Sequence, residues 1–278
     1  MLIRVLSDAI RTLRAAGLPA VGLAYLFLVT ILIILPEPGL LLFVGIVAQF
    51  VVTFALVRYL AARRGIPAKQ DGPPLIARNG QPLRIARRPG PVSAADLSPR
   101  HALRSAGQLA RPAMRLALLQ LFGALFTVVV ALSIGGDSLI PSDQPTEGQV
   151  LRVMAGLVPV AALLLAFVSL APQRIAIEGD HRVILAVFAS IRIARASYGT
   201  LFALSIVEPL LVLAEVATDD APALRIAAIA VHPLVHLVVV AALNEVYAAG
   251  PALVLPAAKA ERGEPTREST RHSCIQPR

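Results

Sequence analysis

The sequence predicts an all-α protein: a polytopic transmembrane bundle of six helices, arranged as three hairpins, with short amphipathic helices at the membrane surface. Of the 278 residues, 56% are hydrophobic and only 15% are charged, and the mean hydropathy is +0.73. A soluble domain is usually about 45–50% apolar. Six apolar runs approach the roughly 20 residues that a helix needs to cross about 30 Å of hydrocarbon. The charged residues gather between these runs, as membrane proteins require.

The six runs divide into three pairs. A tight hairpin is expected between the first two, because Pro36 and Pro38 cannot continue a helix. Residues 1–256 are therefore assigned to one transmembrane domain. Residues 257–278 are polar and mixed in charge, so they are predicted to form a disordered tail. The predicted spans are 18–35, 40–60, 116–134, 153–171, 196–214 and 226–247.

The charge of the loops predicts the orientation. The loops that close the three hairpins carry Asp and Glu but no Lys or Arg. By the positive-inside rule the opposite, arginine-rich side is cytoplasmic, and both termini are expected there. The basic side chains are 24 Arg against 2 Lys, which we interpret as the codon bias of a GC-rich bacterium, so a multi-pass protein of a bacterial inner membrane is predicted. The arginine-rich side includes Arg4, Arg11, Arg14, Arg58, Arg63, Arg64, Arg174, Arg182, Arg192 and Arg195.

A repeated motif precedes some of the hairpins. The string Ile10-Arg11-Thr12-Leu13-Arg14-Ala15 shares four of six positions with the string that begins at Ile191. It predicts three amphipathic helices on the cytoplasmic face, near 2–15, 98–111 and 182–195, each before a hairpin. Residues 65–99 are rich in proline and are predicted to be a flexible cytoplasmic loop. Within that loop, Asn79-Gly80 is a weak β-hairpin signal.

Three segments resemble a loose group of bacterial six-helix membrane proteins. They are Ala171-Pro172-Gln173-Arg174-Ile175-Ala176-Ile177-Glu178-Gly179, Ser190-Ile191-Arg192-Ile193-Ala194-Arg195 and Asn244-Glu245-Val246-Tyr247. The group includes the membrane domain fused to some glycerophosphodiester phosphodiesterases and YciC-like proteins of unknown function. Its Ala-Leu-Arg-Arg-Ser core reads Ala186-Val187-Phe188-Ala189-Ser190 here. The resemblance implies a membrane module without catalytic residues, because the phosphodiesterase chemistry resides in a separate barrel domain.

Glu208, His232 and His236 form the candidate intramembrane polar site. Ionisable groups inside a bilayer are costly and so need a reason. Glu208 and His232 each lie six residues from the outer end of their predicted spans, about 9 Å below the boundary at 1.5 Å per residue. Each also precedes a proline. Their equal depth predicts that Glu208 and His232 face each other inside the bundle.

Three interpretations of this site are open. We favour a structural hydrogen bond between neighbouring helices, with the prolines as ordinary kinks. A proton or solute pathway is the second, and a metal site is the third, because His232 and His236 share a helix face and Glu208 offers a further ligand. Near the cytoplasmic end of the last span, Asn244, Glu245 and Tyr247 are expected to satisfy an interfacial arginine.

No pattern of catalytic residues accompanies these features. The sequence has no GxSxG, HExxH or phosphate-binding glycine loop, and Cys274 is its only cysteine. We therefore predict a protein that is not an enzyme and that has no cofactor and no metal. A scaffold or accessory module associated with anionic lipid headgroups is predicted; the alternative is a small transporter or permease using Glu208 and His232. A membrane-protein partner or a second copy is compatible with either, whereas no motif supports nucleic-acid binding.

Overall fold

The computed structural model describes residues 1–34, 40–66, 91–135, 147–179, 181–218 and 221–261. Within these ranges the chain forms helices and no strand, which confirms the all-α fold class. The elements are α1 (Leu2–Ala16), α2 (Leu18–Ile34), α3 (Leu40–Arg64), the 3-10 helix η1 (Ala94–Leu97), α4 (Pro99–Gly107), α5 (Ala110–Gly135), α6 (Glu147–Val168), α7 (Ala171–Glu178), α8 (Val183–Ser205), α9 (Val207–Ala217) and α10 (Pro222–Glu261).

The protein is a polytopic membrane bundle. Among the described residues, five helical stretches are long and apolar enough to cross a bilayer, and there are six if α1 and α2 are counted as one bent span. The stretches are longer than predicted, because the helices continue into the polar residues at their ends. They cover Phe43–Arg64, Ala110–Val130, Ala155–Glu178, Val183–Glu215 and Pro222–Gly250, with Leu2–Ala16 and Leu18–Thr30 as the bent pair.

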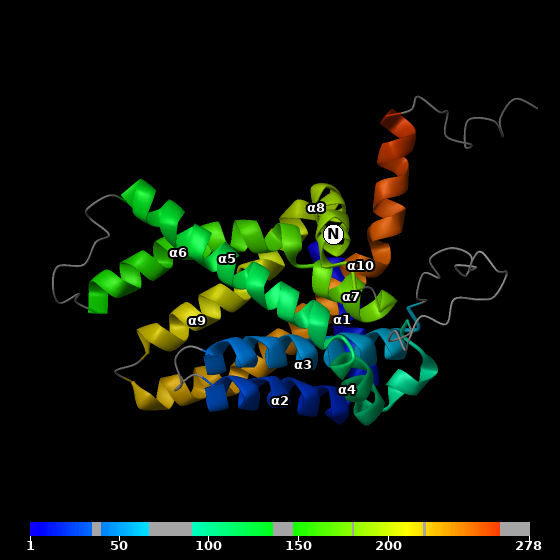
Figure 1. The fold of residues 1–278 in the computed structure, drawn as a ribbon, viewed down its shortest axis with the longest axis horizontal. Helices are drawn as coiled ribbons and strands as arrows, with labels where there is room; N and C mark the ends of the chain where they lie inside the picture. The colour runs from blue at the N-terminus through cyan, green and yellow to red at the C-terminus, as the bar shows by residue number, and fades with distance from the viewer. Residues whose placement is uncertain (35–39, 67–90, 136–146, 180, 219–220, 262–278) are drawn as a thin grey trace, which may run out of the picture.

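The three hairpins point in the same direction. In Figure 1 the facing ends of α2 and α3, of α5 and α6, and of α9 and α10 lie on the left. Helices α1, α4 and α7 lie toward the other end of the bundle. That end is also the arginine-rich one, because α3 finishes there at Arg63 and Arg64. The bundle therefore has one end made of hairpin turns and one end covered by short helices.

Helix α1 is the amphipathic helix predicted near residues 2–15. One face is buried and consists of Val5, Ala9, Thr12 and Ala16, spaced so that they follow a single stripe. At Gly17 the backbone adopts φ +63°, a value that glycine tolerates and that ends the helix. The chain then turns by 101° into α2. Helix α1 thus lies across the bundle rather than along it.

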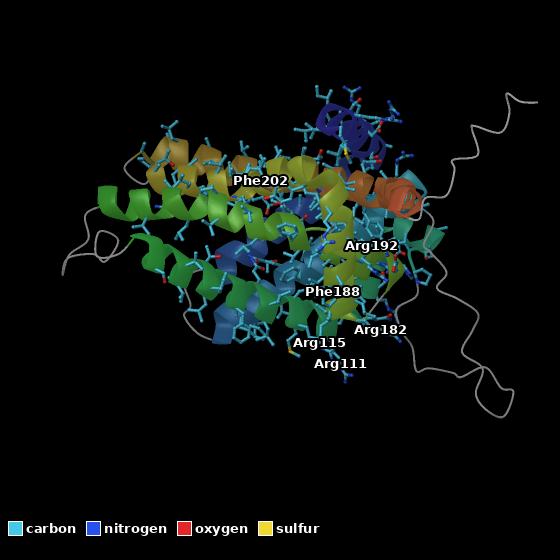
Figure 2. All side chains as sticks on the ribbon, turned by 90° about the horizontal axis from the view of Figure 1, so that it is seen from above. Arg111, Arg115, Arg182, Phe188, Arg192 and Phe202 are labelled. Carbon is cyan, nitrogen blue, oxygen red and sulfur yellow. The ribbon has the colours of Figure 1, made fainter. Side chains whose placement is uncertain are left out.

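The other two predicted amphipathic segments differ in detail. Around 98–111 the helix is shorter, because α4 ends at Gly107 and the arginines at 111 and 115 belong to the spanning helix α5. The segment 182–195 is the first half of α8, which is kinked at Ser197 (φ −132°, ψ 22°). Figure 2 shows the two halves of α8 running in different directions, Phe188 and Arg192 on the first half and Phe202 on the second. The repeat itself stays a prediction.

The predicted fifth span, 196–214, is interrupted. Helix α8 ends at Ser205 and α9 begins at Val207. Proline lacks an amide hydrogen and its ring clashes with the carbonyl four residues earlier. For Pro209 that carbonyl belongs to Ser205, so the break falls where the proline dictates. Helix α9 is therefore a separate element, although α8 and α9 together still form one apolar stretch from Val183 to Glu215.

A buried ion pair ties the end of the predicted loop 65–99 to the bundle. Arg58 on α3 is 2% exposed and Asp96 on η1 is fully buried, and Arg58 Nη2 lies 2.9 Å from Asp96 Oδ2. Arg58 also donates to the Ala176 carbonyl on α7 at 2.8 Å. Asp96 accepts from the Ser105 hydroxyl on α4 at 2.8 Å. The last residues of that loop are thus ordered and packed, contrary to expectation, whereas 67–90, with the Asn79-Gly80 signal, lie outside the described residues.

A second polar cluster holds α1 against α3 and α10. Glu245 on α10 accepts hydrogen bonds from Thr12 Oγ1 at 2.9 Å and from Arg64 Nε at 3.0 Å. The expectation that Glu245 satisfies an interfacial arginine is confirmed. Asn244 instead donates to the Val57 carbonyl, and Tyr247 donates to Glu178. Helix α10 continues to Glu261, so the residues just after 256 are helical rather than the start of a tail; residues 262–278 lie outside the described ranges.

Candidate functional site: a carboxylate–histidine ladder

Four ionisable side chains join α9 to α10. His236 Nδ1 lies 2.6 Å from Glu208 Oε1, and His232 Nδ1 lies 2.7 Å from Glu215 Oε1. We call these four residues the α9–α10 ladder, with two rungs. The histidines are one helical turn apart on α10 and the glutamates are two turns apart on α9, so each set lines one face of its helix. The rungs are therefore a consequence of helical spacing on both elements.

The predicted pair of Glu208 with His232 is wrong. Glu208 bonds His236, one turn further along α10, and His232 bonds Glu215 instead. In an α-helix each side chain leans toward the N-terminus of its own helix. Helix α9 runs toward the hairpin end of the bundle and α10 runs away from it (Figure 1). A carboxylate on α9 therefore leans away from the hairpin end, whereas a histidine on α10 leans toward it. Side chains at unequal Cα depth consequently meet, which a count of residues from the helix ends ignores.

The inner rung has neighbours from two further helices. The ring of Phe27 on α2 stacks on the ring of His236 with centroids 4.0 Å apart and planes 8° apart. Thr53 Oγ1 on α3 lies 3.5 Å from His236 Nε2. The side chain of His236 is only 7% exposed, whereas that of Glu208 retains 37%. Both nitrogens of the His236 ring therefore face polar oxygens, while one face of the ring is covered by an aromatic side chain.

The ladder lacks the geometry of a metal site. Within the residues that the structure describes, no group of three or more His, Cys, Asp or Glu side chains could hold a metal ion. The separation of the ladder into two distinct pairs explains this, because each rung offers only one carboxylate and one imidazole. The predicted set of Glu208, His232 and His236 is therefore divided between the rungs rather than gathered around one centre.

Sequence reasoning missed Glu215, Thr53 and Phe27 as members of this site. Glu215 was assigned to a loop because the fifth span was expected to end at 214. Its position seven residues after Glu208 is the signal that could have found it, since that spacing returns to the same helix face. Phe27 and Thr53 have no such signal, because their place beside His236 depends on how α2 and α3 pack against α10.

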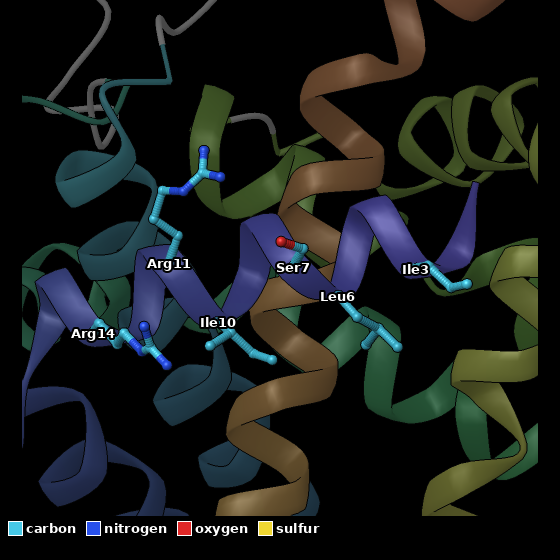
Figure 3. A pocket seen from close by; sticks show the side chains of 6 residues that line it. All are labelled: Ile3, Leu6, Ser7, Ile10, Arg11 and Arg14. Atoms are coloured by element: carbon cyan, nitrogen blue, oxygen red, sulfur yellow. The ribbon is translucent and has the colours of Figure 1, made fainter.

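The exposed face of α1 carries a second candidate site at the opposite end of the bundle. A shallow hollow of about 550 Å³ is lined there by Ile3, Leu6, Ser7, Ile10, Arg11 and Arg14. Figure 3 shows α1 crossing α10 with these side chains along its outer face. Ile3 is 86% exposed, which is unusual for an isoleucine. The hollow thus combines exposed apolar side chains with two guanidinium groups.

Three further arginines lie along one edge of the bundle. Arg111 and Arg115 stand on the first turns of α5, and Arg182 caps the start of α8 (Figure 2). Arg115 Nη1 donates to the His181 carbonyl at 3.4 Å, so the starts of the two helices are neighbours. Phe188, one of the apolar side chains on the first half of α8, is 64% exposed. The same combination of arginine and apolar surface therefore recurs away from α1.

The fold, the intramembrane ladder and the basic short helices together define a multi-pass integral membrane protein of α-helical class. No protein-family model, curated protein or solved structure matches the chain.

Proposed function

We propose that this protein is a non-enzymatic, lipid-associated scaffold or accessory module of a bacterial inner membrane. The exposed face of α1 carries the proposal, because Ile3, Leu6 and Ile10 lie beside Arg11 and Arg14 on a helix that turns 101° away from α2. A helix of this kind lies in the headgroup layer, with its apolar side chains at the acyl boundary and its arginines at the phosphates.

The arginines of α5 and α8 support the same function. Arg111, Arg115 and Arg182 stand where spanning helices begin, and Phe188 supplies neighbouring apolar surface. Arginine suits this role because its planar guanidinium donates two parallel hydrogen bonds to a phosphate. Two separated basic surfaces at one end of the bundle would hold several anionic lipids around the protein.

The resemblance to the six-helix group that includes YciC-like proteins and phosphodiesterase membrane domains points in the same direction. The segment that carries it forms α7, which ends at Glu178, and Gly179 follows with φ +66°. A left-handed residue of this kind favours glycine, which gives the Glu-Gly pair a structural reason. We infer kinship with that group and hence a module that works through its membrane surface.

Both termini are predicted to be cytoplasmic. The basic end of the bundle carries Arg63, Arg64 and the exposed arginines of α1, which the positive-inside rule places in the cytoplasm. Reporter fusions after Gly65, after Gly179 and at the C-terminus should behave as cytoplasmic, and fusions near residues 143 and 219 as external. An external result after Gly179 would contradict the placement of the last two spans.

The lipid proposal predicts selective enrichment of anionic lipid. Protein reconstituted in nanodiscs of mixed phosphatidylglycerol and phosphatidylcholine should retain phosphatidylglycerol preferentially when it is extracted and its lipids are quantified by mass spectrometry. An arginine near an anionic surface contributes about 1 kcal/mol, or roughly fivefold in affinity. Replacing Arg11 and Arg14 together by Gln should therefore reduce the enrichment severalfold.

A matched control separates this effect from a general loss of charge. Arg225 lies near the start of α10, at the hairpin end of the bundle. Arg225→Gln should leave the enrichment unchanged, since it lies far from α1. The proposal fails if the α1 double variant retains as much phosphatidylglycerol as the native protein, or if the Arg225 variant loses as much as the α1 variant.

A further inference from the structure

The proposed lipid association does not use the α9–α10 ladder, because α1 and the other basic surfaces lie toward the opposite end of the bundle (Figure 1). The outer rung is Glu215 with His232, and Glu215 lies two residues before Ala217, where α9 ends. The inner rung, Glu208 with His236, lies about 10 Å further along α9 at 1.5 Å per residue. The ladder thus leads from one end of the bundle toward its interior.

The distances within the rungs are those of hydrogen bonds between an imidazole and a carboxylate. Nitrogen–oxygen separations of 2.6 and 2.7 Å are as short as those of charge-assisted hydrogen bonds. A neutral histidine beside an ionised carboxylate would leave each rung with a net negative charge. Net charge at membrane depth is costly, since lipid offers no hydrogen bonds and little dielectric screening. One added proton per rung removes that net charge.

The parts of α9 and α10 that carry the inner rung contain no cationic side chain of their own apart from His236. The helices packed around the ladder contain no Lys or Arg in residues 18–57, 153–173, 196–224 or 226–258. The nearest charged groups on α10 itself are Arg225 toward the hairpin end and Glu245, which is bound to Arg64. Facing the ladder from the other elements are the titratable Tyr25 on α2, which donates to the Ala230 carbonyl, and the neutral Thr53 on α3.

The surroundings of His236 suit both protonation states. A hydroxyl group both donates and accepts, so Thr53 can accept from the Nε2 hydrogen of a charged imidazole or donate to Nε2 of a neutral one. The face of Phe27 stabilises a positive ring above it. Phe27 and Thr53 already pack against the ring. A proton can bind there because it displaces no side chain.

We propose that the α9–α10 ladder is a two-proton binding site, one proton for each Glu–His rung. A proton passes from a hydronium ion to a ring nitrogen and leaves a water molecule; the imidazolium Nδ1–H then donates to the carboxylate. On the inner rung the second ring hydrogen is donated to Thr53. Loss of the proton reverses the step, with water or hydroxide as the acceptor and Thr53 turning to donate.

Proton release should loosen α9. This helix is separated from α8 by the break before Val207, and the hydroxyl of Ser205 beside the break is buried without a hydrogen-bond partner in the described part of the chain. The two rungs join α9 to α10 through hydrogen bonds. A net negative rung would favour separation of the two helices and entry of water, which makes the ladder a proton-sensitive contact.

A single tryptophan can report the charge of His236. The chain contains none, so Phe27→Trp in nanodiscs would introduce one directly over the His236 ring, and an imidazolium quenches indole fluorescence in contact with it. The emission should rise severalfold as the imidazole loses its proton, in a titration from about pH 5 to about pH 9. Adding His236→Phe should abolish the transition, while Phe122→Trp on the exposed face of α5 should show none.

An infrared measurement covers the case in which the tryptophan variant fails to fold. In the native protein, the pH difference spectrum should contain a band from carboxylate or imidazole groups of the ladder, and Glu208→Gln should remove its inner-rung component. The proposal is overturned if folded Phe27→Trp protein emits independently of pH, if the transition survives His236→Phe unchanged, or if Glu208→Gln leaves the difference spectrum intact.

Discussion

Replacing Asp96 by Ala is expected to lower the free energy of unfolding by about 3–5 kcal/mol, one of the largest effects of any single substitution in this protein. The substitution leaves the guanidinium of Arg58, which is 2% exposed, in the interior without its counter-ion. It also removes one acceptor of the Ser105 hydroxyl, which retains the His101 carbonyl at 2.9 Å. Because the chain lacks tryptophan, unfolding by sodium dodecyl sulfate is best followed by circular dichroism.

Two variants establish that the effect comes from the uncompensated charge. Replacing Arg58 by Met and Asp96 by Leu together should restore much of the lost stability, since apolar groups of similar size tolerate burial where a lone charge does not. Asp8→Ala removes an exposed pair with Arg11 at 3.4 Å and should change stability by less than about 1 kcal/mol. Equal losses for Asp8→Ala and Asp96→Ala would contradict the argument.

The same ion pair sets part of the response to acid. Burial raises the pKa of Asp96, but hydrogen bonds from Arg58, the Ser93 backbone and Ser105, with the charge of Arg58, outweigh burial and hold that pKa below its ordinary value of 3.8. A lowered folded pKa contributes stability that is present above the unfolded pKa and is lost as the pH falls through the folded one. Stability should therefore decline below about pH 4, and Asp96→Ala should reduce this decline.

The spans and their pairing could be predicted because they depend on local features. Long apolar runs identify the helices, prolines separate the first two runs, and the arginine-bearing string Ile10-Arg11-Thr12-Leu13-Arg14-Ala15 indicates the amphipathic helix that α1 forms. These signals act within one or two helical turns. The fold class follows from them without knowledge of any contact between helices.

The partners of the buried polar groups could not be predicted in the same way. Arg58 and Asp96 are 38 residues apart in the sequence. Much of the chain between them is as rich in proline as a linker. One local signal was available, because Ser93 and Asp96 form a capping box at the start of η1. The rungs of the ladder depend on side-chain direction and helix tilt, which periodicity does not encode. Counting residues from the ends of the spans therefore identified Glu208, His232 and His236 as candidates but paired Glu208 with His232 instead of His236.

Replacing Glu245 by Ala is expected to detach α1 locally as well as to destabilise the bundle, by about 1–3 kcal/mol. Thr12 Oγ1 would lose its acceptor while remaining buried, and Arg64 would lose its carboxylate. The side chain of Arg64 is 49% exposed, so water can solvate it and most of the loss arises at Thr12. Glu245→Gln keeps an acceptor for Thr12 and should therefore be the milder change.

Limited proteolysis with trypsin distinguishes local detachment from global unfolding. Arg14 lies near the end of α1, which is anchored by Thr12 to Glu245 and by the Ala16 carbonyl to Tyr59. If Glu245→Ala releases α1, cleavage after Arg14 should accelerate far more than cleavage after Arg192 on α8, because local opening requires less free energy than unfolding. Equal acceleration at both arginines would mean that Glu245 supports the whole bundle rather than the attachment of α1. Arg64→Gln should leave cleavage after Arg14 close to the native rate, since the acceptor for Thr12 is retained.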